Sequence, residues 1–343
     1  MNSSDDLLLK VDDLSVAFKT KKGMAEAVRG ISLEVSRGES LAVVGESGSG
    51  KSVSMLALLN LLPASARIQG SALLGDTQLV GLDAKSMRSI RGRRIAMIFQ
   101  DPMTAFNPVY TVGRQISETI EAHGTASSSE AMRRAIDLLE LVGVPEPAQR
   151  VRQYPHEFSG GMRQRAMIAM AIANSPDLLI ADEPTTALDV TIQAQVLDVL
   201  KDIRAETGAA MILITHDLGV VAGSADRVQV MYGGRVFERG TVDDVFHRPE
   251  NPYTRGLLAS MPRLDSIGGR LEPIPGTPPS VLNMPVGCAF SPRCTYRVDR
   301  CLQEPAQLQS LRLGHDNRCH LSGQLPDLVG SAASSDPGGH NDR

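Results

Sequence analysis

Residues 45–52 read Gly45-Glu46-Ser47-Gly48-Ser49-Gly50-Lys51-Ser52 and match the phosphate-binding pattern G-x-x-x-x-G-K-[ST] at every fixed position. An apolar run at residues 41–44 precedes the motif, and a helix-compatible run at 53–62 follows it. A buried strand, a glycine-rich loop and a helix in this order bind phosphate because the loop amides and the helix N-terminus face the anion. We therefore expect a nucleoside triphosphate site in which Lys51 pairs with the β and γ phosphates and Ser52 holds Mg²⁺.

The surrounding sequence alternates between short apolar runs and helical patterns from about residue 40 to residue 240, which predicts an α/β fold with a parallel central sheet. Residues before this core alternate apolar and polar side chains, which is typical of antiparallel strands with one exposed face. Helical patterns replace strands between residues 109 and 174, where Ser127 and Glu130 form a capping-box pattern. The strands predicted for the core are residues 41–44, 95–99, 178–181 and 211–215, and those before it are 8–18 and 31–35.

The composition is that of a soluble protein with about two domains. The chain has 343 residues, of which 42% are hydrophobic and 22% are charged, and its formal net charge is −4. No apolar run approaches the roughly 18–20 residues that cross a bilayer, and the N-terminus carries acids where a signal peptide needs bases. The acidic balance and the scarcity of aromatic residues argue against a nucleic-acid partner. We expect a cytoplasmic chain that does not itself span a membrane.

A second apolar run, residues 178–181, ends in two carboxylates, Asp182 and Glu183. It lies roughly 130 residues after the phosphate-binding motif, a spacing at which such a pair belongs to the same site. Asp182 is expected to reach Mg²⁺ directly or through water, and Glu183 is expected to act as the general base on the attacking water.

The segment Ser159-Gly160-Gly161-Met162-Arg163-Gln164 resembles the signature sequence of ATP-binding cassette (ABC) ATPases. Gln100 matches the family's Q-loop, Ala187-Leu188-Asp189 its D-loop and His216 its H-loop, all in the family's order, and Phe158 replaces the usual leucine before the signature serine. The resemblance covers residues 7 to 245. It implies a P-loop NTPase ABC cassette with a parallel core sheet, an N-terminal antiparallel β subdomain and a helical subdomain inserted at about 101–174.

The same resemblance implies roles for these residues. In the family, the signature of one subunit covers the nucleotide held by another, and here the signature residues are Ser159, Gly160, Gly161 and Gln164. Because the chain has one such set, it needs a second ATPase subunit. The other implied roles are Gln100 at Mg²⁺ or water, His216 at the γ-phosphate, Asp189 between the two sites of the dimer, and Phe18 against adenine, although a strand phenylalanine belongs to a core about as often.

All four cysteines lie in the last part of the chain, at Cys288, Cys294, Cys301 and Cys319. In a reducing compartment this clustering favours a metal site over disulfides, with four unrelated buried thiols as the alternative. The C-x5-C-x6-C-x17-C spacing leaves the metal open, and His315 or His320 could replace one ligand if the metal is zinc.

Three further segments resemble the C-terminal extension of oligopeptide/dipeptide importer ATPases: residues 251–254 (NPYT), 275–279 (PGTPP) and 287–294 (GCAFSPRC). Residues 183–195 resemble the member of that family's ATPase pair that carries Thr-Thr at this point. Members of this family can hold a [4Fe-4S] cluster on four such cysteines. The predicted organisation is an ABC ATP-binding domain at 1–245, an extension with the four-cysteine cluster at 246–322 and a disordered tail at 323–343.

The resemblance implies an ATPase subunit that powers import of di- or oligopeptides, or of related small solutes, through ATP-driven closure of a dimer. Its implied partners are a paralogous ABC ATPase, two transmembrane permease subunits and an extracytoplasmic solute-binding protein, with no nucleic acid, at the cytoplasmic face of the membrane. The alternative is a soluble ABC ATPase that acts on ribosomes or DNA, but such proteins usually carry two cassettes or long coiled coils. A kinase would leave the signature and His216 without a purpose.

Overall fold

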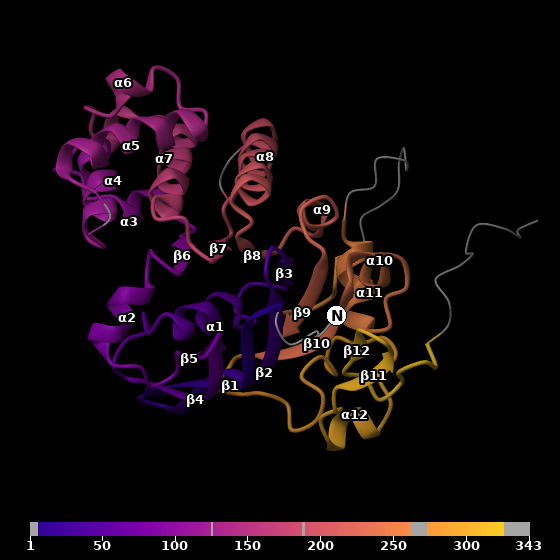
Figure 1. Cartoon of the computed structure of the whole chain (residues 1–343). Helices are drawn as coiled ribbons and strands as arrows, with labels where there is room; N and C mark the ends of the chain where they lie inside the picture. The colour runs from indigo at the N-terminus through magenta and orange to yellow at the C-terminus, as the bar shows by residue number, and fades with distance from the viewer. Residues whose placement is uncertain (1–5, 125, 187–188, 262–272, 326–343) are drawn as a thin grey trace, which may run out of the picture.

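Two β-sheets and a lobe of helices make up the chain in the computed structural model, which describes residues 6–124, 126–186, 189–261 and 273–325 (Figure 1). The smaller sheet is antiparallel, with strand order β2-β1-β4-β5. Leu14 and Val16 of its first strand are fully buried, whereas the polar residues between and around them face outward, as the alternating pattern predicts. The strands are β1 (Leu7–Thr20), β2 (Gly23–Ser36), β4 (Ala66–Leu74) and β5 (Thr77–Gln78).

The larger sheet is the core of the molecule and has the strand order β11-β12-β10-β9-β3-β8-β7-β6. Its five strands from β9 to β6 are parallel, and every residue of β3, β7 and β8 is buried. Burial on both faces explains why these strands read as continuous apolar runs, and it confirms the predicted parallel core. The strands are β3 (Ser40–Val44), β6 (Ile95–Ile98), β7 (Leu178–Asp182), β8 (Ala210–Thr215), β9 (Arg227–Tyr232), β10 (Arg235–Thr241), β11 (Gln309–Arg312) and β12 (His315–Asn317).

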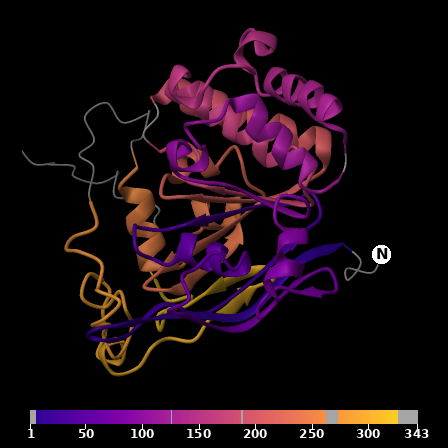
Figure 2. The ribbon, with the colours of Figure 1, turned by 90° about the vertical axis from the view of Figure 1, so that its left-hand side faces the viewer.

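Helices α3 to α7 gather into one lobe beyond the β6 end of the core sheet (Figures 1 and 2). Helix α5 begins after Ser127, but the Ser127 side chain makes no capping hydrogen bond, so the predicted capping box is wrong although the helix start is right. The lobe contains α3 (Pro102–Ala105), α4 (Val112–Glu121), α5 (Ser128–Leu141), α6 (Pro147–Arg150), the 3₁₀ turn η1 (Pro155–Glu157) and α7 (Gly160–Ile172).

The remaining helices lie along the two sheets and in the C-terminal region. Among the residues that the structure describes, no helix has both the length and the apolar character needed to cross a membrane. These helices are α1 (Lys51–Leu58), α2 (Ala84–Ile90), α8 (Val190–Thr207), α9 (Leu218–Val221), α10 (Val242–His247), α11 (Pro252–Ala259) and α12 (Arg300–Gln303).

The C-terminal segment is built into the core sheet. Strand β12 pairs antiparallel with β10, with Asn317 opposite Glu238, and β11 completes the edge. A third hydrophobic cluster joins β3 and β9 to α11 and to Phe290, next to the cysteine segment. The extension therefore shares a sheet and a core with the strand that precedes the phosphate-binding motif, which matters for the site below. Of the predicted tail at 323–343, residues 326–343 lie outside the described residues.

Candidate nucleotide-binding site

The phosphate-binding motif forms the loop between β3 and α1 and lines a cavity of about 590 Å³. Three residues predicted from other parts of the sequence, Gln100, Glu183 and His216, line the same cavity. The parallel register brings them together because β6, β7 and β8 all end at the edge of the sheet where β3 ends. Four residues of the C-terminal region complete the lining, namely Leu257, Ser260, Pro273 and Ile274.

The loop needs glycine where its backbone passes close to neighbouring chain. Gly45 has φ +151°, and a Cβ there would lie 2.2 Å from the Met231 carbonyl oxygen. Gly50 has φ +99°, and its Cβ would meet the Ala27 carbonyl oxygen at 2.6 Å. A side chain at either position would push the loop away from the sheet, so the motif's glycines fix its path as well as its anion-binding shape.

The Lys51 side chain lies inside the phosphate-binding loop. Its Nζ donates to the carbonyl oxygens of Gly45 at 2.6 Å and Glu46 at 3.1 Å, and the residue is 4% exposed. Burial lowers the pKa of this ammonium, while the nearby carboxylates of Glu183, Asp182 and Glu46 oppose the shift. The group is thus held close to where phosphate would enter, in surroundings that favour an anion as its partner.

The two carboxylates at the end of β7 have different neighbours. The Ser52 hydroxyl donates to Asp182 Oδ1 at 2.7 Å, and burial raises the pKa of the Asp182 carboxyl. Glu183 Oε2 accepts from Gln100 Nε2 at 3.0 Å and from the Thr186 hydroxyl at 2.9 Å. His216 Nδ1 lies 3.4 Å from the same oxygen. One carboxylate therefore faces the loop serine, and the other is the meeting point of the expected Q-loop and H-loop residues.

The signature segment lines a second cavity, of about 540 Å³. Ser159 is the N-cap of α7 and accepts from the Met162 amide at 3.3 Å, and Gly160, Gly161 and Asp189 line the same cavity. In the described part of the chain this cavity has no lining residue in common with the first. The N-terminus of α7 therefore offers a second place at which an anion could bind, apart from the phosphate-binding loop.

Three predicted residues need comment. Gln164 is 2% exposed and lies inside the lobe, so it does not line the signature cavity. Phe18 is half-buried against the core between the two sheets and does not line the loop cavity, and its role at adenine stays a prediction. The D-loop residues Ala187 and Leu188 lie outside the described residues.

The structure adds two residues to the site that the sequence patterns missed. Arg293 forms a bidentate ion pair with the Glu46 carboxylate, at 2.6 Å and 2.9 Å. The Tyr253 hydroxyl accepts a hydrogen bond from the Glu46 amide at 2.9 Å. The only signal in the sequence was that both residues fall in segments that resemble a known extension, NPYT and GCAFSPRC, because no local pattern links positions 46 and 293.

The four cysteines line one small apolar cavity of about 20 Å³, together with Phe290 and His320. Burial raises the pKa of the Cys288 thiol to about 11 and that of Cys319 to about 12, and it also raises the pKa of Cys294. Within the described ranges, no three His, Cys, Asp or Glu side chains stand close enough together to hold a metal ion. The thiols therefore fit a thiolate-bound metal in kind but, in the described structure, not in their distances from one another.

The histidines proposed as substitute ligands differ in position. His315 is fully buried between Glu238 and Arg312, with both ring nitrogens in hydrogen bonds of 2.8 Å, so its prediction as a metal ligand is wrong. His320 does line the cysteine cavity, and its Nε2 lies 3.0 Å from the Glu304 carbonyl oxygen.

Comparison with known proteins finds a family model for each of two parts of the chain. The family model described as "ABC transporter" matches residues 28–186, and the model of the "oligopeptide/dipeptide transporter, C-terminal region" matches residues 237–301. The oligopeptide transport ATP-binding protein OppD of Bacillus subtilis is 55% identical over 294 residues, which cover 85% of this chain and 82% of the relative. The chain belongs to the oligopeptide/dipeptide branch of the ABC ATP-binding family.

Other members of this branch match as well. The dipeptide transport ATP-binding protein DppD of B. subtilis is 53% identical over 86% of this chain and 88% of its own. The OppD protein of Mycobacterium tuberculosis is 54% identical over 91% of this chain, which spans about half of that longer relative, 51% of its length.

Solved structures confirm the ABC cassette fold. A dimeric ATP-binding cassette in a post-hydrolysis state, bound to ADP and Pi, matches with a TM-score of 0.62 and 26% identity over 68% of this chain and 99% of that one. The cbiO1 protein of Clostridium perfringens, part of the ABC transporter complex cbiONQ, matches with a TM-score of 0.60 and 27% identity over 71% of this chain and 92% of its own.

Proposed function

We propose that this chain is the ATP-hydrolysing subunit of a membrane importer for di- or oligopeptides. The observation that carries the proposal is the convergence of Lys51, Ser52, Gln100, Glu183 and His216 on one cavity. Membership of the oligopeptide/dipeptide branch supports the solute class, because relatives at 53–55% identity are named for oligopeptide and dipeptide transport. ATPases of ribosomes or DNA find no support among these relatives.

The loop amides and Lys51 bind the phosphate chain, and Lys51 faces the phosphates because its two carbonyl partners hold it within the loop. Ser52, Asp182 and Gln100 would hold Mg²⁺, and the Ser52–Asp182 hydrogen bond of 2.7 Å already places two of them together. When bound, Mg²⁺ offsets the negative charge on the phosphate oxygens.

Glu183 accepts the proton of the attacking water, and His216 orients the γ-phosphate by hydrogen bonding. Gln100 and His216 both reach Glu183 Oε2, so the position of the base depends on the Q-loop and H-loop residues. A displacement of Gln100 or His216 would therefore shift the Glu183 carboxylate relative to the attacking water. This coupling is how the site would report its occupancy to the helical lobe, which begins just after Gln100 at α3.

The signature cavity serves the nucleotide of a second ATPase subunit, a paralogue of this chain. Ser159, Gly160 and Gly161 present the N-terminus of α7 to that nucleotide, and Asp189 stands beside them. Closure of the two subunits around ATP and reopening after hydrolysis drive the transport cycle. Two permease subunits and an extracytoplasmic solute-binding protein complete the importer, and the chain binds at the cytoplasmic face of the membrane.

The four cysteines hold a [4Fe-4S] cluster in this proposal, with zinc as the alternative metal. The proposal rests on the resemblance of residues 287–294 to the family's extension and on the four cysteines lining one apolar cavity. The thiols line this cavity together with Phe290 and would have to move closer together to bind the metal.

The experiment is ATP hydrolysis by the intact complex of this chain with its permeases and solute-binding protein. Saturating di- or oligopeptide should stimulate hydrolysis, and Lys51→Ala in this chain should remove the stimulation. Stimulation by ribosomes or DNA and none by peptide would refute the proposal.

A further inference from the structure

Among the residues that the structure describes, Glu46 of the phosphate-binding loop forms hydrogen bonds to the C-terminal extension. The Glu46 carboxylate meets Arg293 across 247 residues of sequence, through Nη1 at 2.6 Å and Nη2 at 2.9 Å. The Arg293 side chain is 4% exposed, whereas that of Glu46 is 27% exposed and lines the nucleotide cavity. A buried guanidinium thus reaches outward to hold a carboxylate at the wall of the site.

Arg293 is itself fixed by hydrogen bonds to the extension and the core. Its Nε donates to the Pro275 carbonyl oxygen at 2.8 Å, and its Nη1 donates to the Tyr232 hydroxyl at 3.2 Å. Nη2 also reaches the Ile274 carbonyl oxygen at 3.4 Å, and Ile274 lines the nucleotide cavity. The bond to Glu46 is the main reason why the pKa of Arg293 is raised. The guanidinium therefore connects the loop, strand β9 and one wall of the cavity.

Tyr253 makes the second attachment. Its hydroxyl accepts from the Glu46 amide at 2.9 Å, and its ring is fully buried among those of Tyr232, Phe237 and Phe290. Burial raises the pKa of the Tyr253 hydroxyl, which favours its neutral form. Backbone and side chain of Glu46 are thus both held by residues outside the cassette motifs.

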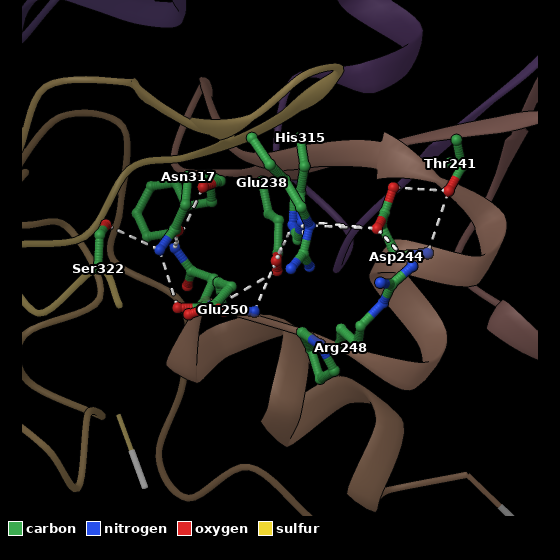
Figure 3. Close-up of polar contacts among 12 residues, drawn as sticks. Glu238, Thr241, Asp244, Arg248, Glu250, His315, Asn317 and Ser322 are labelled. Atoms are coloured by element: carbon green, nitrogen blue, oxygen red, sulfur yellow. Dashed lines mark hydrogen bonds and ion pairs between the residues drawn. The ribbon is translucent and has the colours of Figure 1, made fainter. Parts of the chain in front are cut away.

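A buried polar network connects this support to the edge of the core sheet (Figure 3). Asn251, the N-cap of α11, donates through Nδ2 to Asn317 Oδ1 of β12 at 2.8 Å. Glu238 of β10 accepts from the Glu250 amide at 2.7 Å and from His315 Nε2 at 2.8 Å. Arg312 Nη2 donates to His315 Nδ1 at 2.8 Å, which leaves Nε2 as the protonated nitrogen that faces Glu238. The N-cap of α11, two residues before Tyr253, is therefore bonded to the edge of the core sheet.

The electrostatic consequence concerns the ligand. Glu46 places a negative charge in a loop that must receive a chain of phosphates, and like charges repel more strongly at a partly buried site than in water. The guanidinium of Arg293 offsets that negative charge. Because the Arg293 side chain is 4% exposed, water screens its attraction to Glu46 only weakly. Without Arg293, the carboxylate would face the phosphates unpaired.

We propose that Arg293 is a positioning residue of the nucleotide site, through which the C-terminal extension sets the affinity of the phosphate-binding loop for the nucleotide. This proposal rests on the proposed function, because it takes the cavity to be an ATP site. It assigns the extension a direct part in nucleotide binding by its own chain, through charge neutralisation at Glu46 and not through contact with phosphate.

The test is calorimetric titration of the purified full-length chain with MgATP. Arg293→Gln should weaken binding about tenfold at low salt, which corresponds to ~1.4 kcal/mol. The loss should shrink at 0.5 M salt, because salt screens the repulsion between Glu46 and the phosphates. The double variant Glu46→Gln/Arg293→Gln should recover affinity to within about threefold of the unmodified chain, since the uncompensated charge is gone. Arg300→Gln is the matched control: Arg300 pairs with Glu304 on the exposed surface of α12, at 2.6 Å, and its loss should change nothing.

An unchanged affinity in Arg293→Gln would overturn the inference. A loss that the double variant fails to recover, or that salt leaves unaltered, would also overturn it, since a purely structural role predicts both. If Arg293→Gln fails to fold, Arg293→Lys can replace it in the test. Lysine keeps the positive charge but loses the bidentate geometry, so the loss of MgATP affinity should be smaller, and salt should again reduce it. Failure of the unmodified chain to bind MgATP would instead refute the proposed function, and the two failures are thus distinct.

Discussion

Replacing Glu183 by glutamine tests the proposed base with the smallest possible change. The substitution exchanges one carboxylate oxygen for an amide nitrogen and keeps the length of the side chain. Gln100, Thr186 and His216 all approach the same oxygen, Oε2, at 3.0, 2.9 and 3.4 Å. An amide oxygen in that place can still accept the hydrogen bonds from Gln100 and Thr186.

These contacts determine the expected changes in stability, MgATP affinity and hydrolysis rate. Because the hydrogen bonds survive on an acceptor of the same shape, the free energy of unfolding should change by less than about 1 kcal/mol. Lys51 and the loop amides are untouched, so MgATP affinity should stay within about threefold of the unmodified chain. An amide cannot take a proton from water, and loss of general-base catalysis lowers rates by about 10²–10⁴-fold.

The assay is ATP hydrolysis by the intact complex, with MgATP binding measured on the same preparation. Glu304→Gln is the control, because the Glu304 carboxylate lies on the surface and pairs with Arg300. Hydrolysis by Glu183→Gln within fivefold of the unmodified complex would refute the assignment of Glu183 as the base. A fall in hydrolysis that merely follows a fall in affinity would refute it equally.

Three other predictions follow from the described contacts. Ser52→Ala removes the hydroxyl that donates to Asp182 Oδ1 at 2.7 Å, and it should raise the Mg²⁺ concentration for half-maximal hydrolysis about tenfold; an unchanged Mg²⁺ titration would contradict this. His315→Ala removes one donor of the fully buried Glu238, which keeps the Glu250 and Asn251 amides, and it should lower the free energy of unfolding by about 1.5–3 kcal/mol in urea denaturation; a loss below about 1 kcal/mol would show that this bond is dispensable. The chain purified without oxygen should be brown and contain iron and sulfide, and Cys301→Ser should lose both; colourless protein free of iron would exclude the cluster.

The sequence predicted the parts of the fold that are local and buried on both faces. Residues 41–44 and 178–181 read as strands because every side chain of β3 and β7 is buried. The phosphate-binding loop was equally clear, since its glycines and lysine lie within eight consecutive positions. Each of these features depends on neighbours in the chain.

Features that depend on contacts between residues far apart in the sequence could not be predicted from local sequence patterns. Strands β11 and β12 have four and three residues with mostly polar side chains, so no alternation marks them, and only pairing with β10 makes them strands. The Arg293–Glu46 pair joins a residue beside a cysteine to a position that the motif leaves free. The start of α5 was predicted correctly, but the predicted capping box is absent. Ser127 is the N-cap residue, and its side chain makes no capping hydrogen bond.

We propose that ATP hydrolysis at this site drives peptide import. This proposal is tested most directly by uptake of a labelled di- or oligopeptide into proteoliposomes that contain the complete importer with its solute-binding protein. With the unmodified chain, uptake should require MgATP, and with Glu183→Gln it should stay near background. Uptake at an unchanged rate with Glu183→Gln, or no peptide uptake by an importer that hydrolyses ATP, would contradict the proposal.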